Sequence, residues 1–266
     1  NGHEALNCFD HMQDDGVSSD PILFVCALKA CGCKGEVSKG QDLHTEIVIK
    51  GFDRNMHVCS SLVDMYAKFG YLSISKKLLD SLSIRGLVSW NALITGYVKF
   101  GYADEALTCF DQMQHEAIPP DAITYACSLT ACGFTGAADK GQEIHDMIVK
   151  QGYLLERHPS VVNALIDMYA KCGLLTVAHN VFDSLLYRDV VLWTILISGY
   201  AEHGYCEEAL NCFSEMQYEG ISPDALTFVC CLKACGSIGA TDMGEEIHAE
   251  IARQGLLEEE DAVLGN

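Results

Sequence analysis

Basic residues are scarce in this chain of 266 residues. Its 17 lysines and arginines stand against 37 aspartates and glutamates, which gives a formal net charge of −20. Taken alone, this balance argues against a nucleic-acid partner, because phosphate binding relies on lysine and arginine. Net charge describes the whole surface, however, and a local groove can carry the opposite sign. The places of the few basic residues therefore matter more than their number.

Long apolar runs and enzyme motifs are also lacking. No window approaches about 18 uninterrupted apolar residues, so we expect no membrane span. No phosphate loop, hydrolase elbow or metalloprotease motif occurs, and we predict no catalytic site and no small-molecule substrate. His44 and His248 each begin a His-x-Glu sequence like half of a zinc deaminase site, but no Cys-x-x-Cys completes it. The third copy reads His145-Asp146-Met147, so we interpret these periodic histidines as structural and expect no metal and no cofactor.

A repeat explains where the few prolines lie. The stretch VSWNALITGY at 88–97 returns as VLWTILISGY at 191–200, and EALTCF at 105–110 returns at 4–9 and 208–213 as EALNCF. Self-similarity at a fixed period indicates a stacked array rather than a single globular core. All five prolines fall at unit boundaries, as helix hairpins require: Pro21, Pro119, Pro120, Pro159 and Pro223.

Each unit is predicted to form two antiparallel helices. In one unit, apolar residues recur at helical spacing from Val88 to Phe100, and Gly101 supplies a left-handed stop. A second helix is expected from about Ala103 to His115, and the prolines that follow end the unit. We therefore predict an all-α fold.

The units come in three variants in a fixed order. One variant of 35 residues ends in Pro-Asp and covers 87–121 and 190–224, with 1–20 as the tail of another copy. A second variant contains Ala-Cys-Gly and covers 21–55, 122–158 and 225–261. The third, of 31 residues, covers 56–86 and 159–189, with 262–266 as the start of another.

Most of the 14 cysteines recur with the units. Equivalent positions hold Cys8, Cys109 and Cys212; Cys26, Cys127 and Cys230; and Cys31, Cys132 and Cys235. In a small secreted protein this many cysteines would indicate disulfides. Because equivalent positions face the same core between units, we interpret them as small buried hydrophobic residues in a reducing compartment. Disulfides and metal binding are the alternatives.

This alternation of units resembles the pentatricopeptide repeat proteins of plants, in their subclass with long and short variants. The resemblance rests on VSWNALITGY, NALIDMYAKCG at 163–173, SLVDMYAKFG at 61–70, LKACG at 232–236 and GQEIHDMIVKQG at 141–152, and it covers all 266 residues. It implies a right-handed superhelical α-solenoid of helix-turn-helix repeats. In family terms the Pro-Asp units are P-type, the Ala-Cys-Gly units L-type and the shortest units S-type. Tetratricopeptide repeats show a different Trp/Gly/Tyr pattern, which is absent here.

The resemblance also implies that the fifth and last residues of a unit read one RNA base together. The pairs at these positions are Asn91 with Asp121, Asn163 with Asp189, and Thr194 with Asp224. By the same resemblance an Asn/Asp pair prefers uracil and a Thr/Asp pair prefers guanine. The alternative is that the terminal aspartate only caps the next helix, although capping and base reading are compatible.

The other units depart from this pattern. Ser60 would pair with Gly86, which has no side chain to offer. The Ala-Cys-Gly units pair Val25 with Asn55, Ala126 with His158, and Val229 with Asp261. An apolar fifth residue cannot hydrogen-bond a base, so we expect these units to space the RNA or to contact a partner protein.

Two further sets of residues are candidates for contact with RNA, the first of them by resemblance. Val88 and Val191, second in their units, would sandwich bases, although valine suits a helix start equally well. Lys68, Lys99 and Lys171 are thirteenth in their units, beside the concave face that first helices line in such arrays. That place suits phosphate contact, and the alternative is a solvated surface.

We therefore predict a sequence-specific array that binds single-stranded organellar RNA and serves as the recognition part of a C-to-U editing factor. The alternative is a protein-interaction solenoid, whose Ala-Cys-Gly units would by resemblance bind multiple organellar RNA editing factors. The resemblance places the protein in a mitochondrion or chloroplast, and we expect any targeting segment or deaminase domain to lie outside these residues. We also expect the Thr194 side chain to point into the groove, so that Thr194→Asn would hardly change thermal stability.

Overall fold

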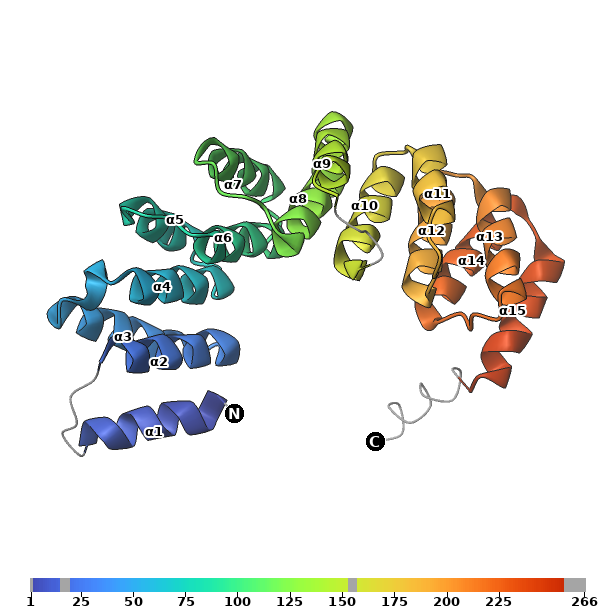
Figure 1. Cartoon of the computed structure of the whole chain (residues 1–266). Coiled ribbons are helices and arrows are strands. Elements are labelled where there is room, and N and C mark those ends of the chain that lie inside the picture. The colour runs from blue at the N-terminus through green and yellow to red at the C-terminus, as the bar shows by residue number, and fades with distance from the viewer. Residues whose placement is uncertain (1, 15–19, 153–156, 256–266) are drawn as a thin grey trace. The chain divides into compact units, whose positions relative to one another are not determined.

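The computed structural model describes residues 2–14, 20–152 and 157–255, and every regular element in these ranges is a helix. The all-α prediction is confirmed. The chain forms two compact halves, Asn1–Ala131 and Cys132–Asn266, whose boundary falls inside one helix. Each half consists of successive helices joined by short connections (Figure 1).

The N-terminal half contains helices from four consecutive units. The elements are α1 (Gly2–Asp14), α2 (Pro21–Lys34), α3 (Val37–Ile49), the 3-10 turn η1 (Phe52–Arg54), α4 (Met56–Lys68), α5 (Leu72–Ser81), α6 (Leu87–Lys99) and α7 (Ala103–His115). Helix α8 (Ala122–Thr135) carries the boundary between the halves. The C-terminal half continues with α9 (Ala138–Lys150), α10 (Pro159–Lys171), α11 (Leu175–Asp183), α12 (Val190–Glu202), α13 (Cys206–Tyr218), α14 (Ala225–Ile238) and α15 (Thr241–Arg253).

The observed helices follow the punctuation of the sequence. The helix expected over 88–100 is α6, shifted by one residue, and the helix expected over 103–115 is α7 with the same bounds. Gly70 and Gly101 follow first helices with φ of 80° and 81°, a conformation that L side chains rarely adopt. Asp20, Asn55, Asp189 and similar residues at unit ends accept a hydrogen bond from the first turn of the next helix.

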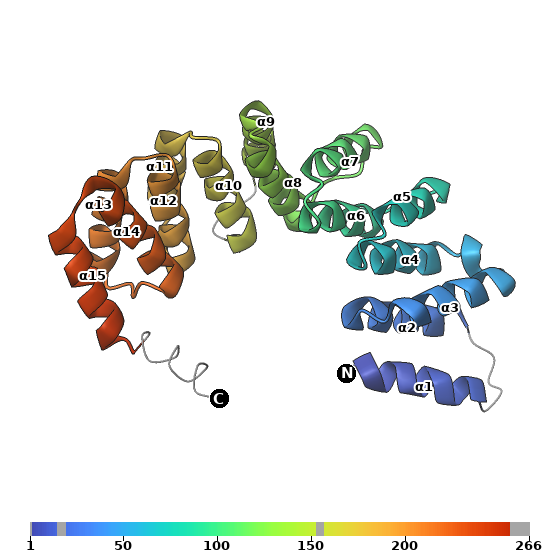
Figure 2. The same cartoon turned by 180° about the vertical axis from the view of Figure 1, so that it is seen from behind.

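The first helices of successive units lie side by side in each half. In the N-terminal half α2 packs on α4 and α4 on α6, and in the C-terminal half α10 packs on α12 and α12 on α14 (Figures 1 and 2). The second helices pack behind this row. Trp90 and Leu93 of α6 and Phe110 and Met113 of α7 are fully buried. The two helices of a unit thus bury their apolar side chains together in one section of the core.

Two polar contacts repeat between neighbouring units. His44 Nδ1 lies 2.9 Å from the hydroxyl of Tyr66, and His145 Nδ1 lies 2.8 Å from that of Tyr169, so each of these two histidines contacts the unit that follows its own. The described residues include no group of three or more His, Cys, Asp or Glu side chains that could hold a metal. None of the helices in the described part of the chain is long and apolar enough to cross a membrane.

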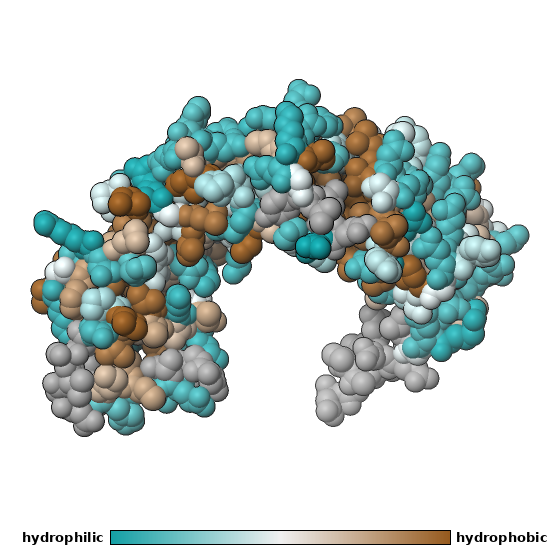
Figure 3. Space-filling view, viewed as in Figure 1, coloured by the Kyte–Doolittle hydropathy of each residue, from teal (hydrophilic) through white to brown (hydrophobic). Residues whose placement is uncertain are grey.

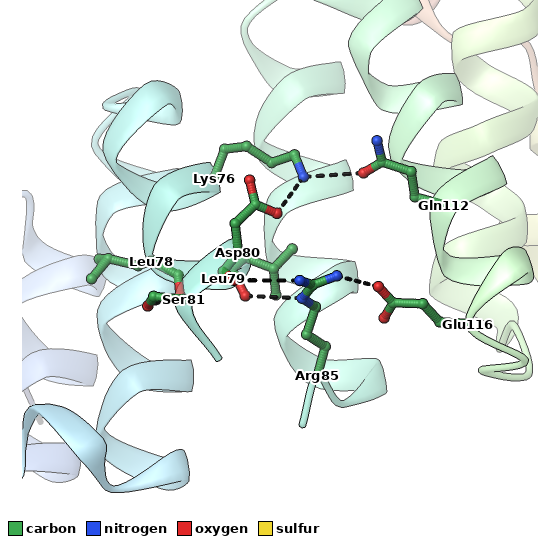
Figure 4. A network of polar contacts seen from close by, with 8 residues as sticks. All are labelled: Lys76, Leu78, Leu79, Asp80, Ser81, Arg85, Gln112 and Glu116. Carbon is green, nitrogen blue, oxygen red and sulfur yellow. Dashed lines mark hydrogen bonds and ion pairs between the residues drawn. The ribbon is translucent and has the colours of Figure 1, made fainter. Parts of the chain in front are cut away.

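An arginine joins the 31-residue unit to the unit that follows it. Arg85 donates to the carbonyl oxygens of Leu79 at 3.2 Å and Asp80 at 3.3 Å, at the C-terminal end of α5, and forms an ion pair with Glu116 (Figure 4). Lys76 adds a second link to α7 through Gln112 at 3.0 Å. The C-terminal half repeats this arrangement with Arg188 and Glu219 at 2.8 Å.

The prediction that the periodic cysteines are buried is only partly correct. All 14 cysteines lie in the described ranges as free thiols. Buried positions include Cys109, Cys132 and Cys235, but Cys8 and Cys26 are exposed and Cys127 is half-buried. Cys109 lies beside the charged groups of α5. Cys127, 3.4 Å from Thr95 of α6, lies along the row of first helices rather than in the core.

Candidate nucleic-acid interface

The first helices carry more basic than acidic residues. Helices α2, α4, α6, α8, α10, α12 and α14 carry exposed Lys29, Lys34, Lys68, Lys99, Lys171 and Lys233 against Asp64, Asp167 and Glu202. The second helices are acidic: α7 and α13 each carry three carboxylates and no lysine or arginine. Figure 3 shows a hydrophilic surface over α13 and α15. The net charge of −20 therefore resides mainly outside the first helices, although aspartates such as Asp121 and Asp224 cap the starts of these helices.

A groove in the N-terminal half brings together residues from every predicted class. It has a volume of about 320 Å³ and lies between α4, α6 and the start of α8. Its lining includes the reading pair Asn91 and Asp121, the proposed stacking residue Val88, and both Lys68 and Lys99. Residues 53 positions apart in the chain (68 and 121) thus meet at one surface because successive first helices stack side by side.

The Asn91 and Asp121 side chains are in direct contact. Asn91 Nδ2 donates to Asp121 Oδ1 at 2.9 Å, and the Thr124 hydroxyl donates to Asn91 Oδ1 at 2.6 Å. The same Asp121 oxygen accepts the backbone N–H of Thr124 at 2.9 Å and so caps α8. Asn91 is 8 % exposed at the floor of the groove, and Thr124 is fully buried.

These hydrogen bonds keep Asp121 ionised. Burial acting alone would raise the pKa of its carboxyl group, but hydrogen bonds from Thr124, Asn91 and the Ile123 backbone outweigh burial and lower that pKa. A carboxylate only accepts hydrogen bonds, so the Asn91 amide must turn its NH₂ group toward Asp121.

The Thr194 and Asp224 pair is linked through a third residue. Thr194 Oγ1 lies 2.6 Å from Thr227 Oγ1, which lies 2.8 Å from Asp224 Oδ1. Thr194 also donates to the backbone oxygen of Val190 at 2.8 Å and is only 5 % exposed. The expectation that Thr194 projects into the groove is therefore wrong, because neighbouring first helices approach closely enough for its hydroxyl to bond between them.

The Asn163 and Asp189 pair shares a pocket without such a network. The pocket, of about 190 Å³, also contains Tyr187 and Leu192. Asp189 accepts from the Leu192 backbone N–H at 3.0 Å and caps α12. No hydrogen bond joins the Asn163 and Asp189 side chains in the described part of the chain. Leu192 is the third residue of the unit that follows, where the units after the other two reading pairs have Thr124 and Thr227, so no hydroxyl can bridge this pair.

The third residue of the following unit was missed in the sequence analysis. Thr124 and Thr227 each contact the fifth residue of the preceding unit, and Ser89 does the same for Ser60 at 2.8 Å. A signal was present, because Asp-x-x-Thr at 121–124 and 224–227 is a capping-box pattern. Helix capping alone did not indicate that the same hydroxyls reach across the unit boundary.

The Ala-Cys-Gly units have apolar fifth residues in a similar place. Val25 and Ala126 are half-buried and Val229 is 45 % exposed. Asn55 caps α4 through its side chain, whereas His158 precedes α10 without a side-chain cap. Asp261 lies outside the described residues. Val25, Ala126 and Val229 have no polar group with which to contact a base.

The second residues present exposed apolar side chains. Val88 is 71 % exposed and Val191 is 44 % exposed, and Ile22, Ile123 and Leu226 at equivalent positions are exposed as well. A helix start does not require an aliphatic side chain in solvent. Such a surface suits contact with the flat, weakly polar faces of unstacked bases.

The three lysines differ in their partners. Lys68 pairs with Asp64 and Lys171 with Asp167, both at 2.7 Å and one helical turn apart. Lys99 Nζ instead lies 5.5 Å from the centroid of the Phe100 ring. Exposed pairs of this kind contribute only about 0.3–0.5 kcal/mol, so a phosphate group can compete for the ammonium group.

Comparison with known proteins finds relatives that are built from the same kind of repeat. Residues 85–133 and 188–237 match the PPR repeat family, and residues 160–190 match the PPR repeat. Over 252 residues the chain is 36 % identical to the chloroplastic pentatricopeptide repeat-containing protein CRR2 of Arabidopsis thaliana, an alignment that covers 92 % of this chain and 38 % of CRR2. Over 255 residues it is 34 % identical to At3g11460, a mitochondrial pentatricopeptide repeat-containing protein of the same plant, with 96 % of this chain and 41 % of that protein covered.

A solved structure shows the same fold. The crystal structure of the pentatricopeptide repeat protein PPR10 in complex with an 18-nt psaJ RNA element is similar with a TM-score of 0.82. The sequence identity is 23 %, and the match covers 96 % of this chain and 38 % of that chain. The chain thus spans less than half the length of these relatives.

Proposed function

This chain is a pentatricopeptide repeat protein, and on that premise we propose that it binds single-stranded RNA and reads bases through the fifth and last residues of its units. The observation that carries the proposal is the groove in which Asn91, Asp121, Val88, Lys68 and Lys99 converge. It offers a polar contact for a base edge, an apolar contact for a base face and ammonium groups for phosphates. The PPR10 structure, which contains an RNA element, supports this choice of ligand.

The unit boundaries define the proposed reading register. Units 87–121, 159–189 and 190–224 carry the three reading pairs, and unit 122–158 has Ala126 at its fifth position. If the array runs parallel to the RNA, as the family resemblance implies, these four consecutive units specify 5′-U-N-U-G-3′. Unit 56–86, with Ser60 and Gly86, contributes a weaker contact because Gly86 lacks a side chain.

Titration of labelled RNA oligonucleotides against the chain tests this proposal. We expect an oligonucleotide that contains UNUG to bind more tightly than versions in which adenine replaces one of the two uracils or the guanine. Each substitution should cost on the order of 1–3 kcal/mol if discrimination resembles that of other nucleic-acid readers. Substitution at N should have little effect. Equal affinity for all versions would rule out base reading by these residues.

We infer the biological setting from the relatives and from the order of the units. The relatives are chloroplastic or mitochondrial, so the proposed place of action is one of these organelles. The alternation of long and short units supports assignment to the editing-factor subclass, with C-to-U editing as the process served. Loss of editing at a defined organellar site in a plant that lacks the gene, restored by the intact gene, would test this role.

A second candidate function is protein binding. The acidic second helices and the exposed Val229 at a fifth position favour a partner other than RNA on part of the surface. By resemblance this partner is a multiple organellar RNA editing factor, bound by the Ala-Cys-Gly units. Loss of such binding on Val229→Asp, with RNA affinity retained, would separate the two functions.

A further inference from the structure

We propose that the hydroxyl group on the third residue of a unit positions the fifth-residue side chain of the unit before it, and thereby sets which hydrogen-bonding group that side chain presents to a base. Thr124 and Thr227 are these positioning residues for Asn91 and Thr194. The inference rests on the proposed base reading and adds to it a residue outside the reading pair.

The contacts of Asn91 leave its amide one orientation. Asp121 is ionised and can only accept, so Asn91 Nδ2 faces it at 2.9 Å. Thr124 Oγ1 lies 2.6 Å from Asn91 Oδ1 and 3.0 Å from Asp121 Oδ1, and we assign its single hydroxyl proton to the nearer acceptor, the amide oxygen. The amide oxygen is thus engaged inside the protein, and the second Nδ2 hydrogen is left to donate toward the groove. A donor matches a base edge with carbonyl oxygens, of which uracil has two.

Thr194 is left as a hydrogen-bond acceptor, the opposite of the donor that Asn91 presents. Thr194 lies 2.8 Å from the Val190 carbonyl oxygen and 2.6 Å from Thr227 Oγ1, which lies 2.8 Å from the Asp224 carboxylate. If Thr227 donates to Asp224, Thr194 donates to Thr227. If Thr227 instead donates to Thr194, Thr194 donates to Val190. Either way its single proton is used internally, so the Thr194 hydroxyl can only accept any further hydrogen bond. An acceptor matches guanine, whose edge carries N–H donors.

The chain contains a natural example without this hydroxyl. Leu192 occupies the third position after the Asn163 unit, and the Asn163 amide has no hydroxyl partner there. Its orientation is therefore not imposed, and both amide faces remain available to a base. We expect the base opposite unit 159–189 to be discriminated less sharply than the base opposite unit 87–121, although both units carry an Asn/Asp pair.

Helix capping alone would also account for the threonines. Thr124 Oγ1 accepts the Asp121 backbone N–H at 3.2 Å, and Thr227 makes the same contact with Asp224. A residue that only caps a helix affects stability and leaves base preference unchanged. The two roles are therefore separated by which base binds best.

The test compares three variants by RNA titration, with all four bases placed opposite each reading unit. Thr124→Val removes the hydroxyl at nearly constant shape and should reduce the preference for uracil over cytosine opposite unit 87–121 by roughly 3- to 10-fold. Thr124→Ser should retain it. Leu192→Thr, beside the capping carboxylate of Asp189, should sharpen the uracil preference opposite unit 159–189 by a similar factor. The guanine preference opposite unit 190–224 is the internal control and should not change.

The outcomes distinguish this inference from the function on which it rests. If the unmodified chain shows no base preference, the proposal of base reading is rejected, and the proposed positioning role is rejected with it. If the unmodified chain discriminates but Thr124→Val and Leu192→Thr leave every preference unchanged, base reading stands and the positioning role is overturned. Should Thr124→Val not fold, Leu192→Thr decides the matter alone, because it adds a hydroxyl instead of removing one.

Discussion

The fifth residues combine two properties that usually exclude each other, since they are nearly buried and yet are the proposed contacts to a ligand. Asn91 is 8 % exposed and Thr194 is 5 % exposed, and both bond to a threonine of the next unit. A side chain held in this way loses little rotational freedom when a base arrives, which favours affinity. Burial also means that a substitution here affects folding as well as recognition.

Thr194→Asn should move the preferred base from guanine to uracil with a small loss of stability. The Asn91 site shows that an asparagine at this position can accept from a threonine and donate to the terminal aspartate. We therefore expect unfolding free energy to change by less than about 1 kcal/mol. RNA titration and thermal denaturation measure the two effects.

Thr194→Val is the matched control for that substitution. It keeps the shape of the side chain but leaves the buried Thr227 hydroxyl without its partner at 2.6 Å. We expect a loss of about 1–3 kcal/mol and no acquired preference for uracil. If Thr194→Asn unfolds the protein as much as Thr194→Val does and guanine remains preferred, Thr194 is a packing residue only.

The half-buried His44 and His145 predict a loss of stability in mild acid. Burial lowers the pKa of His44 and His145 from 6.5, with Asp53 and Asp146 opposing this effect. Because protonation is then easier in the unfolded chain, their stabilising effect is complete above pH 6.5 and is lost as the pH falls below it toward the folded-state pKa. The urea concentration at the midpoint of unfolding should therefore decrease as the pH is lowered from about 7.5 to 5.5.

Glutamine at both positions should flatten this dependence. A glutamine can still bond Tyr66 or Tyr169 but does not titrate in this range. His115→Gln, at an exposed position with no such tyrosine contact in the described structure, should leave the pH dependence unchanged. A double variant His44→Gln/His145→Gln that keeps the full decrease would assign the acid sensitivity to other groups.

Helix pairs were predictable from the sequence, whereas the contacts between units were not. Gly101 and the Pro119-Pro120 pair mark where α6 and α7 end, and apolar spacing identifies their buried faces. The burial of Thr194 depends instead on how closely the next first helix approaches, which no pattern inside one unit records. Cys26 and Cys230 make the same point, since equivalent positions are exposed in one unit and buried in another.

The arginine between helix pairs should contribute measurably to stability. Arg85→Ala removes two hydrogen bonds to carbonyl oxygens at the end of α5 and the ion pair with Glu116 (Figure 4). We expect a loss of about 1–2 kcal/mol in urea unfolding, since the ion pair alone is worth less than about 1 kcal/mol. Arg54→Ala, at an exposed position in η1, is the control. Equal effects of Arg85→Ala and Arg54→Ala would show that this network does not hold the units together.

Within each half of the molecule, charge is divided between the first and the second helices of the units. Six lysines and three acidic residues lie on the first helices, while α7 and α13 carry only carboxylates among their Asp, Glu, Lys and Arg residues. An acidic protein can in this way bind a polyanion on one face while the remaining surface repels it. Orientation of the RNA on the array would then be set by charge before any base is read.

The salt dependence of RNA binding tests this division. If Lys68, Lys99 and Lys171 each neutralise one phosphate, every contact contributes about −0.7 to the slope of log K against log salt. Replacing all three with alanine should therefore flatten the slope by about 2 while base preference survives. Lys99 has no carboxylate partner among the described residues, so Lys99→Ala should give close to its full share. Lys68 and Lys171 must first break their ion pairs with Asp64 and Asp167. This reduces their contribution to RNA affinity more than their contribution to the salt slope.

A matched triple variant makes the measurement decisive. Lys50, Lys77 and Lys150 lie on or at the ends of second helices and carry the same charge, and Lys50 also has a carboxylate partner one turn away in Glu46, at 2.7 Å. Replacing these three with alanine changes the net charge of the protein as much as the first variant does. If attraction is local to the first helices, the slope of this control should stay near that of the unmodified chain. Equal slopes for both triple variants would mean that RNA responds to total charge, and the lysines at position thirteen would then belong to the solvated surface.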